Sequence, residues 1–199
     1  QFLIMDYIDQ GSELDWAVFG KKLAQLHQIE GKFFGLDHDN YIGSLEQINK
    51  ECGEWSEFYT NHRLLTLTAK ARDQGLFEKK HCNWVEKLCQ RLDELIPACK
   101  PSLIHGDLWS GNLLIDTSGH PVLIDPAVYY GHPEMDWAML SLFGSYPVEA
   151  LDHYQDLHPL EKGLNKRIDI HQLYPLMVHL ILFGKGYLNG VESTLKKYA

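Results

Sequence analysis

Cysteine and positive charge are both scarce in this chain of 199 residues. Its four cysteines lie far apart and include no Cys-x-x-Cys pair, which argues against a disulfide framework and for reduced thiols in a cytoplasmic protein. Lysine and arginine total 18 against 27 for aspartate and glutamate, so the formal net charge is −9. This surplus of negative charge argues against general binding to nucleic acid or to an anionic membrane surface.

Long hydrophobic runs are missing as well. The longest, residues 176–183, contains a histidine and is far shorter than the roughly 20 residues that a membrane-spanning helix needs. The chain starts with Gln1 and an apolar stretch that lacks the basic region and cleavage pattern of a signal peptide. Because no methionine stands at position 1, we expect a fragment of a longer protein. The content of 45% hydrophobic and 23% charged residues is that of a folded domain.

Most of the chain has the spacing of apolar residues that is typical of helices. This spacing predicts helices over residues 13–30, 55–70, 77–96, 134–143, 148–157, 164–183 and 185–198. Ser12 and Asp15 predict a capping box before the first helix, and Pro175 predicts a kink or division within residues 164–183. Short apolar runs between residues 102 and 125 predict strands instead, with a β-hairpin over 113–124. The expected fold class is therefore α+β and mostly α-helical.

The polar residues with the most specific spacing flank this hairpin. Asp107 follows a His-Gly pair, Asn112 comes five residues later, and Asp125 opens an Asp-Pro-Ala sequence where the hairpin ends. Kinases have an aspartate, an asparagine and a second aspartate in this order, and their hairpin folds both carboxylates to one point. Phosphoryl transfer then assigns the roles. Asp107 accepts the proton of the acceptor hydroxyl or orients that hydroxyl, and Asn112 and Asp125 are oxygen ligands for Mg²⁺.

Two simpler interpretations compete with this one. Glycine, aspartate, asparagine and proline gather in turns, so these motifs could be turns without chemistry, and a catalytically dead descendant would keep the same residues. Three polar residues at the right spacing around a hairpin favour the kinase interpretation. The eleven histidines include no His-Glu-x-x-His motif and no pairing with cysteine at zinc-like spacing, so the sequence predicts no further metal site.

Residues 2–11 resemble the hinge of a kinase, because an apolar stretch breaks into acidic and glycine-containing sequence ahead of the first helix. On that alignment Met5 is the gatekeeper, and the carbonyl group of Asp6 and the amide group of Ile8 bind the adenine of ATP. An ordinary edge strand explains the same pattern.

The motif HGDLWSGN at 105–112, together with DPAVYYGHPEMD at 125–136, resembles the fructosamine and ketosamine kinase family. Two shorter sequences, DNYIG at 39–43 and FGKGY at 183–187, agree with it. Related aminoglycoside and choline kinases share the two aspartates and the asparagine, but not Trp109 or the Tyr-Gly-His sequence at 130–132. The resemblance covers nearly the whole chain and only the C-terminal lobe of such a kinase.

The resemblance implies a protein-kinase-like fold in which a small hairpin carries the catalytic and metal loops. Residues 1–11 would be a hinge strand or linker from an N-terminal lobe that is missing, and residues 12–199 the helical C-terminal lobe. It implies ATP and Mg²⁺ as cofactors. It also implies phosphorylation of the sugar 3-hydroxyl of fructosamines or ribulosamines, either free or attached to protein, which is a deglycation step. We further expect self-association through the surface that faces the missing lobe.

Five other residues are predicted to support this site. The face of Trp109 suits the CH surface of a sugar or the apolar part of its amine, although packing of the loop is the alternative. Tyr130 and His132 follow the metal loop and are expected to shape the acceptor pocket. His105 is expected to bond the loop backbone, and Asp136 to brace the catalytic loop.

Two other functions remain open. The chain could belong to a small-molecule kinase with a different acceptor, such as an aminoglycoside or an amino alcohol. It could also be a non-catalytic fragment, because half of the phosphate-binding apparatus of a kinase would lie in the missing lobe.

Overall fold

The computed structural model describes residues 6–198. About half of the chain is helical, and the remainder includes six short strands among the described residues. In chain order the elements are α1 (Trp16–His27), β1 (Asn40–Ile42), β2 (Leu45–Gln47), α2 (Trp55–Phe58), the π-helical η1 (Tyr59–Leu64), α3 (Leu65–Asp73), α4 (Lys79–Cys89), α5 (Leu92–Leu95), β3 (Ser102–Ile104), the 3₁₀ turn η2 (Ser110–Asn112), β4 (Leu113–Ile115), β5 (Pro121–Leu123), β6 (Tyr129–Gly131), α6 (Glu134–Leu142), α7 (Val148–Gln155), α8 (Leu164–Phe183), the 3₁₀ turn η3 (Lys185–Tyr187) and α9 (Leu188–Tyr198).

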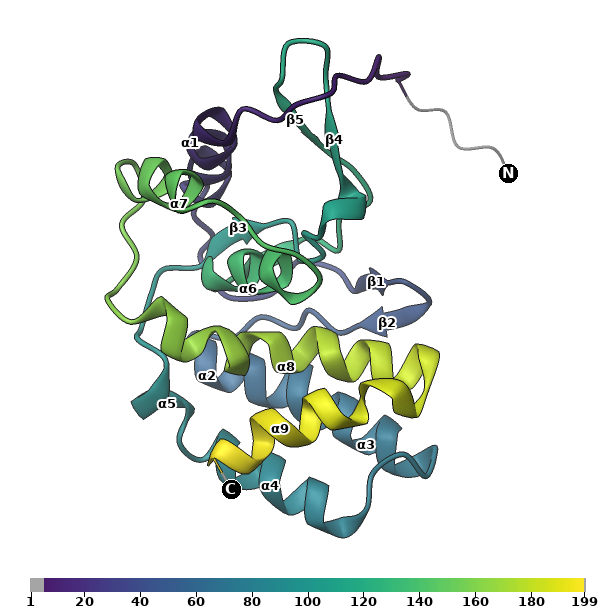
Figure 1. The fold of residues 1–199 in the computed structure, drawn as a ribbon. Coiled ribbons are helices and arrows are strands. Elements are labelled where there is room, and N and C mark those ends of the chain that lie inside the picture. The colour runs from purple at the N-terminus through teal and green to yellow at the C-terminus, as the bar shows by residue number, and fades with distance from the viewer. Residues whose placement is uncertain (1–5, 199) are drawn as a thin grey trace.

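Two apolar clusters hold these elements together. The larger one lies in the lower part of Figure 1, where the long helix α8 packs against α3, α6 and α9. The smaller one joins α1 and α7 to Trp137 of α6 and to Leu108 of the loop after β3. The strand β3, which pairs with β6, lies between the two apolar clusters, together with α6 (Figure 1). The loop that follows β3 therefore has an apolar cluster on each side that holds it in place.

The hairpin β4–β5 projects at the top of Figure 1 and pairs Leu113 with Leu123 and Ile115 with Pro121 in antiparallel register. The chain ahead of α1 runs along its edge. Gly11 donates its backbone N–H to the carbonyl oxygen of Ile115 at 2.8 Å, and Asp15 donates to that of Gly119 at 2.9 Å. These bonds tie the first described segment to the hairpin.

The start of the first helix differs from the prediction. Asp15, rather than Ser12, is the N-cap residue, and its carboxylate accepts the backbone N–H of Val18 at 2.9 Å. No capping box forms, because the residue three positions after the cap is valine, which has no acceptor for the N–H of the cap. The helix is shorter than predicted by a few residues at each end, which is the usual error at helix ends.

Of the kink or division predicted at Pro175, the division was wrong, because α8 continues through this residue without interruption. Proline has no N–H, so the carbonyl group four residues earlier, that of His171, loses its helical partner. The hydroxyl of Tyr59 from η1 lies beside this gap. It donates to the carbonyl oxygen of Ile170 at 2.6 Å, approaches that of His171 at 3.4 Å and accepts the N–H of Tyr174 at 3.3 Å. A side chain from another element therefore compensates for the missing N–H.

Three further differences concern the bounds of two predicted helices and the strands that were not predicted. The predicted helix over 55–70 is a continuous series of α2, η1 and α3, and the one over 77–96 is two helices, α4 and α5. The strands β1, β2 and β6 were not predicted. Among the described residues, no helix combines the length and the hydropathy needed to cross a membrane.

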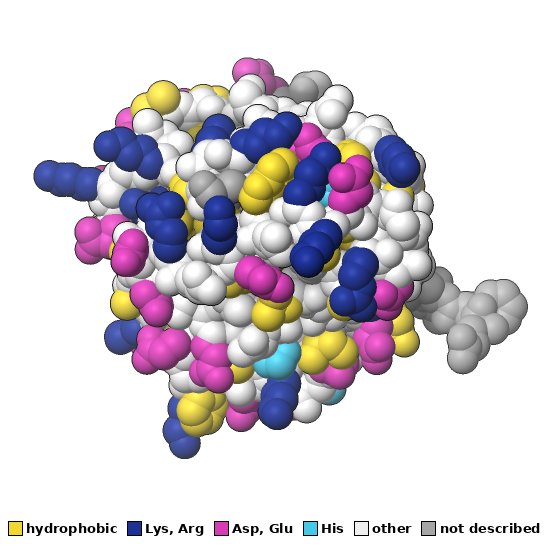
Figure 2. All heavy atoms as spheres, turned by 90° about the horizontal axis from the view of Figure 1, so that it is seen from below, with side chains coloured by type: hydrophobic (Ala, Val, Ile, Leu, Met, Phe, Trp, Pro, Cys, Tyr) yellow, Lys and Arg dark blue, Asp and Glu magenta, His cyan; other side chains and the backbone are white. Residues whose placement is uncertain are grey.

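Charged side chains of both signs cover the face of the molecule seen from below, where Lys and Arg gather on one part and Asp and Glu on another (Figure 2). Basic residues stand in the last turns of α3 (Lys70 and Arg72) and α9 (Lys196 and Lys197), where the helix dipole favours positive charge. Apolar side chains on this face are scattered. The negative net charge is therefore not uniform over the surface.

Candidate active site

The two loops that flank the hairpin meet at Asn112. Its side-chain Nδ2 donates to the backbone oxygen of Asp107 at 2.9 Å and to the carboxylate Oδ2 of Asp107 at 3.1 Å. The same Nδ2 lies 3.5 Å from the backbone oxygen of Asp125. The turn η2 ends at Asn112, directly before β4. In this position the side-chain nitrogen Nδ2 of Asn112 is directed at Asp107, and its side-chain oxygen Oδ1 takes part in none of these bonds. The structure thus brings Asp107, Asn112 and Asp125 together.

Backbone conformation makes this meeting possible. Gly106 has φ of +80°, and a Cβ atom there would lie 2.2 Å from the carbonyl oxygen of Ala127, so only glycine fits. Asp125 has φ of +51° and is the one non-glycine residue with positive φ in the part of the chain that the structure describes. A left-handed conformation costs an aspartate free energy, and such residues cluster at functional sites.

Burial makes Asp107 a better base than an exposed aspartate. Desolvation raises the pKa of its carboxyl, and the negative charge of Asp125 raises it further. Interactions with His105, Asn112 and His179 oppose this effect without cancelling it. A carboxylate of raised pKa has a higher affinity for the proton that an acceptor hydroxyl gives up.

His105 links the catalytic loop to the end of the hairpin. Its Nε2–H donates to the carbonyl oxygen of Ile124 at 3.0 Å, since a carbonyl oxygen can only accept. Its Nδ1 accepts the backbone N–H of Asp107 at 3.3 Å. Both ring nitrogens are therefore used within the loop.

Asp136, at the start of α6, is completely buried beneath the same loop. Its carboxylate accepts the backbone N–H of His105 at 2.7 Å and that of Gly106 at 2.9 Å. It also accepts Nε2–H of His27 at 3.1 Å. Burial alone would raise the pKa of this carboxyl, but the bonds from His27 and His105 hold it below the ordinary value. An ionised carboxylate therefore lies under the backbone of the loop.

The support behind Asp136 was not predicted from the sequence. The Nδ1 atom of His27 in α1 lies 2.7 Å from the hydroxyl of Tyr154 in α7. Helices α1 and α7 of the smaller cluster thus position His27, which in turn donates to Asp136. The residues are 109 and 127 positions apart along the chain. No local pattern could have indicated this chain of bonds.

The metal loop has a second support that was also missed. In β1 and β2, Asn40 donates to the carbonyl oxygen of Val128 at 2.8 Å and Gln47 donates to that of Ala127 at 3.1 Å. Behind them the guanidinium of Arg63 is fully buried, donates to Asn49 at 2.8 Å and lies over the ring of Tyr129. The DNYIG sequence at 39–43 was the available signal, since it contains Asn40.

Trp109 lies beside Asp107 and is 39% exposed. It lines a hollow of about 340 Å³ together with Phe143 directly after α6, His179 and Phe183 of α8, and Tyr187 of η3. The ring packs directly over Gly111, where a Cβ atom would lie 2.2 Å from the indole. The geometry leaves Trp109 accessible to a ligand.

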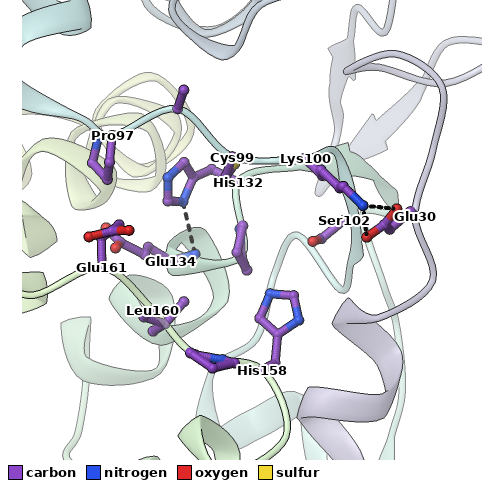
Figure 3. Close-up of a pocket in the computed structure, with 13 residues that line it drawn as sticks. Glu30, Pro97, Cys99, Lys100, Ser102, His132, Glu134, His158, Leu160 and Glu161 are labelled. Carbon is purple, nitrogen blue, oxygen red and sulfur yellow. Dashed lines mark hydrogen bonds and ion pairs between the residues drawn. The ribbon is translucent and has the colours of Figure 1, made fainter.

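The structure does not bring Tyr130 and His132 to this hollow. Because β6 runs antiparallel to β3, Tyr129 pairs with Ile104 next to the catalytic loop, whereas Gly131 pairs with Ser102 at the far end. His132 therefore lies beyond the end of the strand that is remote from Asp107. It is buried and lines a separate hollow of about 240 Å³ between the segment before β3 and residues 158–161 (Figure 3). The sequence placed these residues near Asp125, but strand direction carries them away.

His132, Glu134 and His171 form a buried cluster of metal-ligating residue types, with one ligand atom of each within 4.8 Å of the others. Arg167 already compensates the charge of Glu134 through bonds of 2.9 Å and 2.5 Å. Burial opposes ionisation, yet the bonds from Arg167 and His171 lower the pKa of Glu134 to about 2. Burial and the neighbouring His171 lower the pKa of His132 to about 3. The cluster is an ion-pair network with a neutral histidine beside it.

The predicted hinge is only partly described. Met5 lies outside the described residues, Asp6 is exposed and Ile8 is partly buried. Within the described residues, Gln10 forms an isolated bridge with Asp116, and Gly11 donates its backbone N–H to Ile115. The assignment of these residues to adenine binding stays a prediction.

The loop residues fit a divalent cation with oxygen ligands. Asn112 uses its nitrogen on Asp107, which leaves the carbonyl oxygen Oδ1 of its amide for a ligand. Asp125, whose backbone oxygen lies 3.5 Å from that nitrogen, has an exposed carboxylate. Carbonyl and carboxylate oxygens are the donors that Mg²⁺ prefers. These oxygen ligands lie in the loops next to the half-buried carboxylate of Asp107.

Comparison with solved structures defines the class. A choline kinase from Streptococcus pneumoniae superimposes with a TM-score of 0.59 at 21% identity, over 96% of this chain and 68% of that chain. At this identity the likeness shows the fold alone, which is protein-kinase-like. The match of the fructosamine kinase family model to residues 1–199 places the chain among phosphotransferases that act on an alcohol group.

The fructosamine kinase family model matches residues 1–199, and the chain belongs to this family. It is 40% identical over 199 residues to a protein of Lactiplantibacillus plantarum named "probable ketoamine kinase", covering 99% of this chain and 71% of the relative. It is 37% identical over 204 residues to the chloroplastic protein-ribulosamine 3-kinase of Arabidopsis thaliana, covering 99% and 61%. A structure from Thermobifida fusca whose description names fructosamine-3-kinase superimposes with a TM-score of 0.91 at 38% identity, over 96% of this chain and 68% of that one. The chain thus spans about two thirds of the length of these relatives.

Proposed function

We propose that the protein transfers the γ-phosphoryl group of ATP to the sugar 3-hydroxyl of fructosamines or ribulosamines. The observation that carries this proposal is the meeting of Asp107, Asn112 and Asp125 around one amide nitrogen. Family membership supports kinase activity, and the names of the relatives from Lactiplantibacillus plantarum and Arabidopsis thaliana support a ketoamine or ribulosamine acceptor.

In this proposal Asp107 receives or orients the acceptor hydroxyl. The hydroxyl oxygen attacks the γ-phosphorus, the bond from this phosphorus to the β–γ bridging oxygen breaks, and the hydroxyl proton leaves to the Asp107 carboxylate. The raised pKa of Asp107 favours this proton transfer. ADP and the sugar phosphate are the products.

Asn112 and Asp125 would hold the Mg²⁺ that accompanies ATP. When bound, this ion neutralises charge on the triphosphate. His105 and Asp136 fix the loop backbone so that Asp107 and Asn112 keep their relative positions. Trp109 offers an aromatic face to the acceptor beside Asp107.

The test uses the chain extended by the N-terminal lobe that we expect ahead of it, and measures ATP consumption with a fructosyl-lysine analogue, a ribulosyl-lysine analogue, an aminoglycoside and choline. We expect turnover on a ketosamine and poor turnover on the other two, because a pocket built for one acceptor discriminates against others. Activity confined to the aminoglycoside or choline would replace the acceptor and keep the kinase. Silence on all four acceptors would contradict the proposal. The 199-residue chain alone is assayed in parallel, and we expect it to be essentially inactive.

The same assay tests Asp107. In Asp107→Asn we expect turnover to fall by about 10²- to 10⁴-fold, the range for a positioned acid or base. Asp73→Asn is the matched control, because Asp73 is 68% exposed and pairs only with its neighbour Arg72. Full activity of Asp107→Asn would remove the proposed base.

A further inference from the structure

Three amide side chains lie behind the segment that follows Asp125. We call them the amide cluster, and its members are Asn40, Gln47 and Asn49. Asn40 and Gln47 are directly opposite each other in the antiparallel pair β1–β2, so their side chains share one face of it. Gln47 and Asn49 are buried, and Asn40 is half-buried. Buried amides need hydrogen-bond partners, and the partners here decide which way each amide points.

The amide cluster begins at a group that can only donate. Arg63 of η1 is fully buried, and its guanidinium donates to Oδ1 of Asn49 at 2.8 Å and to the carbonyl oxygen of Ile48 at 2.5 Å. A guanidinium cannot accept a hydrogen bond, so the side-chain oxygen of Asn49 has to face it. The side-chain nitrogen of Asn49 is thereby directed at Asn40, whose Oδ1 it reaches at 2.8 Å. Arg63 therefore sets the orientation of Asn49.

Asn40 continues the same direction of bonding into the metal loop. Its Oδ1 accepts from Asn49 and from Nε2 of Gln47, at 2.8 Å in both cases. Its Nδ2 is left for the carbonyl oxygen of Val128, to which it donates at 2.8 Å. A carbonyl oxygen can only accept, so this end of the amide cluster is as strictly defined as the end at Arg63. Hydrogen bonds that run in one direction polarise and strengthen one another.

Gln47 holds the neighbouring carbonyl group. Its Nε2 donates to the carbonyl oxygen of Ala127 at 3.1 Å, and its Oε1 accepts the hydroxyl of Tyr174 in α8 at 2.8 Å. The backbone N–H of Ala127 donates to the carbonyl oxygen of His105 at 3.0 Å. Ala127 is therefore fixed between the amide cluster and the catalytic loop.

This fixation acts on Asp125 through the backbone. Asp125 has φ of +51°, a left-handed conformation that costs an aspartate free energy and persists only where the surrounding structure enforces it. The carbonyl groups of Ala127 and Val128 are held by the amide cluster, and the intervening Pro126 has little freedom in φ. The amide cluster therefore restricts how far Asp125 can move away from Asn112.

We propose that the amide cluster positions the metal site, and that Asn40 is the positioning residue at its end. By holding the backbone after Asp125, Asn40 would set the affinity for the divalent cation that accompanies the nucleotide. This inference rests on the proposed function, in which Asn112 and Asp125 hold Mg²⁺. Groups that orient metal ligands from behind typically contribute about 10- to 100-fold to metal affinity.

Titration calorimetry tests this role without turnover. The chain extended by the N-terminal lobe is titrated with the non-hydrolysable ATP analogue adenylyl imidodiphosphate, once with Mg²⁺ and once with a chelator. The ratio of the two affinities is the metal-dependent gain. Asn40→Ala removes the donor to Val128 at a half-buried position, so the fold is retained. We expect the gain to fall by about 10-fold and the affinity for the metal-free analogue to stay the same.

Asn40→Asp separates the lost donor from the effect of charge. The carboxylate has nearly the shape of the amide and no N–H for Val128, and it adds a negative charge on the side of the metal loop. Charge alone would strengthen the binding of a cation. We expect the metal-dependent gain to fall instead, as in Asn40→Ala. Asn189→Asp makes the same substitution at an exposed position of α9 and should leave the gain unaltered.

Three outcomes would overturn the inference. An unchanged or larger gain in either Asn40 variant would show that the bond to Val128 does not act on the metal site. An equal loss of affinity with and without Mg²⁺ would show that the amide cluster supports only the fold. Absence of any metal-dependent gain in the unchanged protein would leave no metal site to position.

Two further readouts distinguish this failure from failure of the proposed function. Asp125→Asn removes the proposed metal ligand, and the extended chain with MgATP and a fructosyl-lysine analogue is assayed for phosphorylated sugar. Loss of the gain in Asp125→Asn but not in the Asn40 variants keeps the proposed metal site and overturns the inference. A smaller gain in the Asn40 variants without phosphorylation by the unchanged protein supports the positioning role and contradicts the proposed reaction. A full gain in Asp125→Asn would overturn both.

Discussion

The two carboxylates at the catalytic loop, those of Asp107 and Asp136, differ in their surroundings and in the direction of their pKa shifts. Asp107 is half-buried and has a raised pKa, whereas Asp136 is buried beneath the loop and has a lowered pKa. The difference comes from hydrogen bonding, because Asp136 accepts two backbone N–H groups and the ring of His27. Residues of one type thus acquire opposite pKa shifts from their surroundings, which suits Asp107 to the proposed role of base and Asp136 to that of support.

Asp136→Asn tests the supporting role. The amide cannot accept all three bonds with its single oxygen, so we expect a loss of about 3 kcal/mol in the free energy of unfolding and a fall in turnover of roughly 100-fold as the loop shifts. Chemical denaturation and steady-state kinetics measure the two effects. Asp152→Asn on the exposed side of α7 should leave both unchanged. A variant of normal stability and turnover would show that the loop holds itself.

Gly111→Ala tests whether the position of Trp109 matters. A Cβ atom at residue 111 would lie 2.2 Å from the indole ring, so the ring must turn away. We expect KM for the acceptor to rise by about 10-fold with little change in thermal stability, because residue 111 is exposed. Gly53→Ala is the control, since nothing lies within 4 Å of its added atom. An unchanged KM in Gly111→Ala would argue that Trp109 only packs the loop.

At the scale of elements, each short strand pair has a positional task. The hairpin β4–β5 returns the chain so that Asp125 meets Asn112, the pair β3–β6 leads into the catalytic loop, and β1–β2 holds the carbonyl groups after Asp125 through Asn40 and Gln47. The helices supply the apolar bodies on which these short pairs depend, because an isolated two-stranded hairpin is marginally stable.

The bond pattern around Pro175 yields a test of coupling between η1 and α8. Tyr59→Phe removes the hydroxyl that serves the carbonyl groups of Ile170 and His171, and we expect a loss of about 1–3 kcal/mol in the free energy of unfolding. Pro175→Ala restores an N–H for His171 in the helix. The loss caused by Tyr59→Phe should therefore be smaller in the Pro175→Ala background. Additive effects in this double-mutant cycle would contradict the coupling.

At the scale of the whole molecule, buried histidines make stability depend on pH. The pKa of His132 is lowered to about 3 by burial and by His171, while an exposed histidine has a pKa of about 6.5. Between these two pH values the unfolded chain therefore binds a proton at His132 that the folded chain does not bind. This contribution to stability is complete above pH 6.5 and is lost as the pH falls from about 6.5 toward 3, at up to about 1.4 kcal/mol per pH unit.

His132→Asn should flatten this dependence between pH 6.5 and 5. In that range the lowered pKa of Glu134 does not contribute, because its effect is lost only below about pH 4.5. Denaturant titrations at several pH values measure the slope, and His38→Asn at a 68% exposed position is the control. The burial of His62 and His158 lowers the pKa of each and adds slope of the same sign in both proteins, so the difference isolates His132. Equal slopes would contradict a neutral His132.

Self-association stays a prediction, for which light scattering at rising concentration is the measurement.

The amino-acid sequence was enough to predict what depends on near neighbours: most helices, the hairpin, and the grouping of Asp107, Asn112 and Asp125, because a short hairpin leaves little freedom to the residues that flank it. It did not reveal that Tyr59 bridges the gap at Pro175, that His27 supports Asp136, that rings of α8 join Trp109, or that strand direction separates His132 from Asp107. Those contacts join residues distant along the chain, and no spacing rule encodes them. Packing of the two apolar bodies decides which distant side chains meet, so only the tertiary structure could show them.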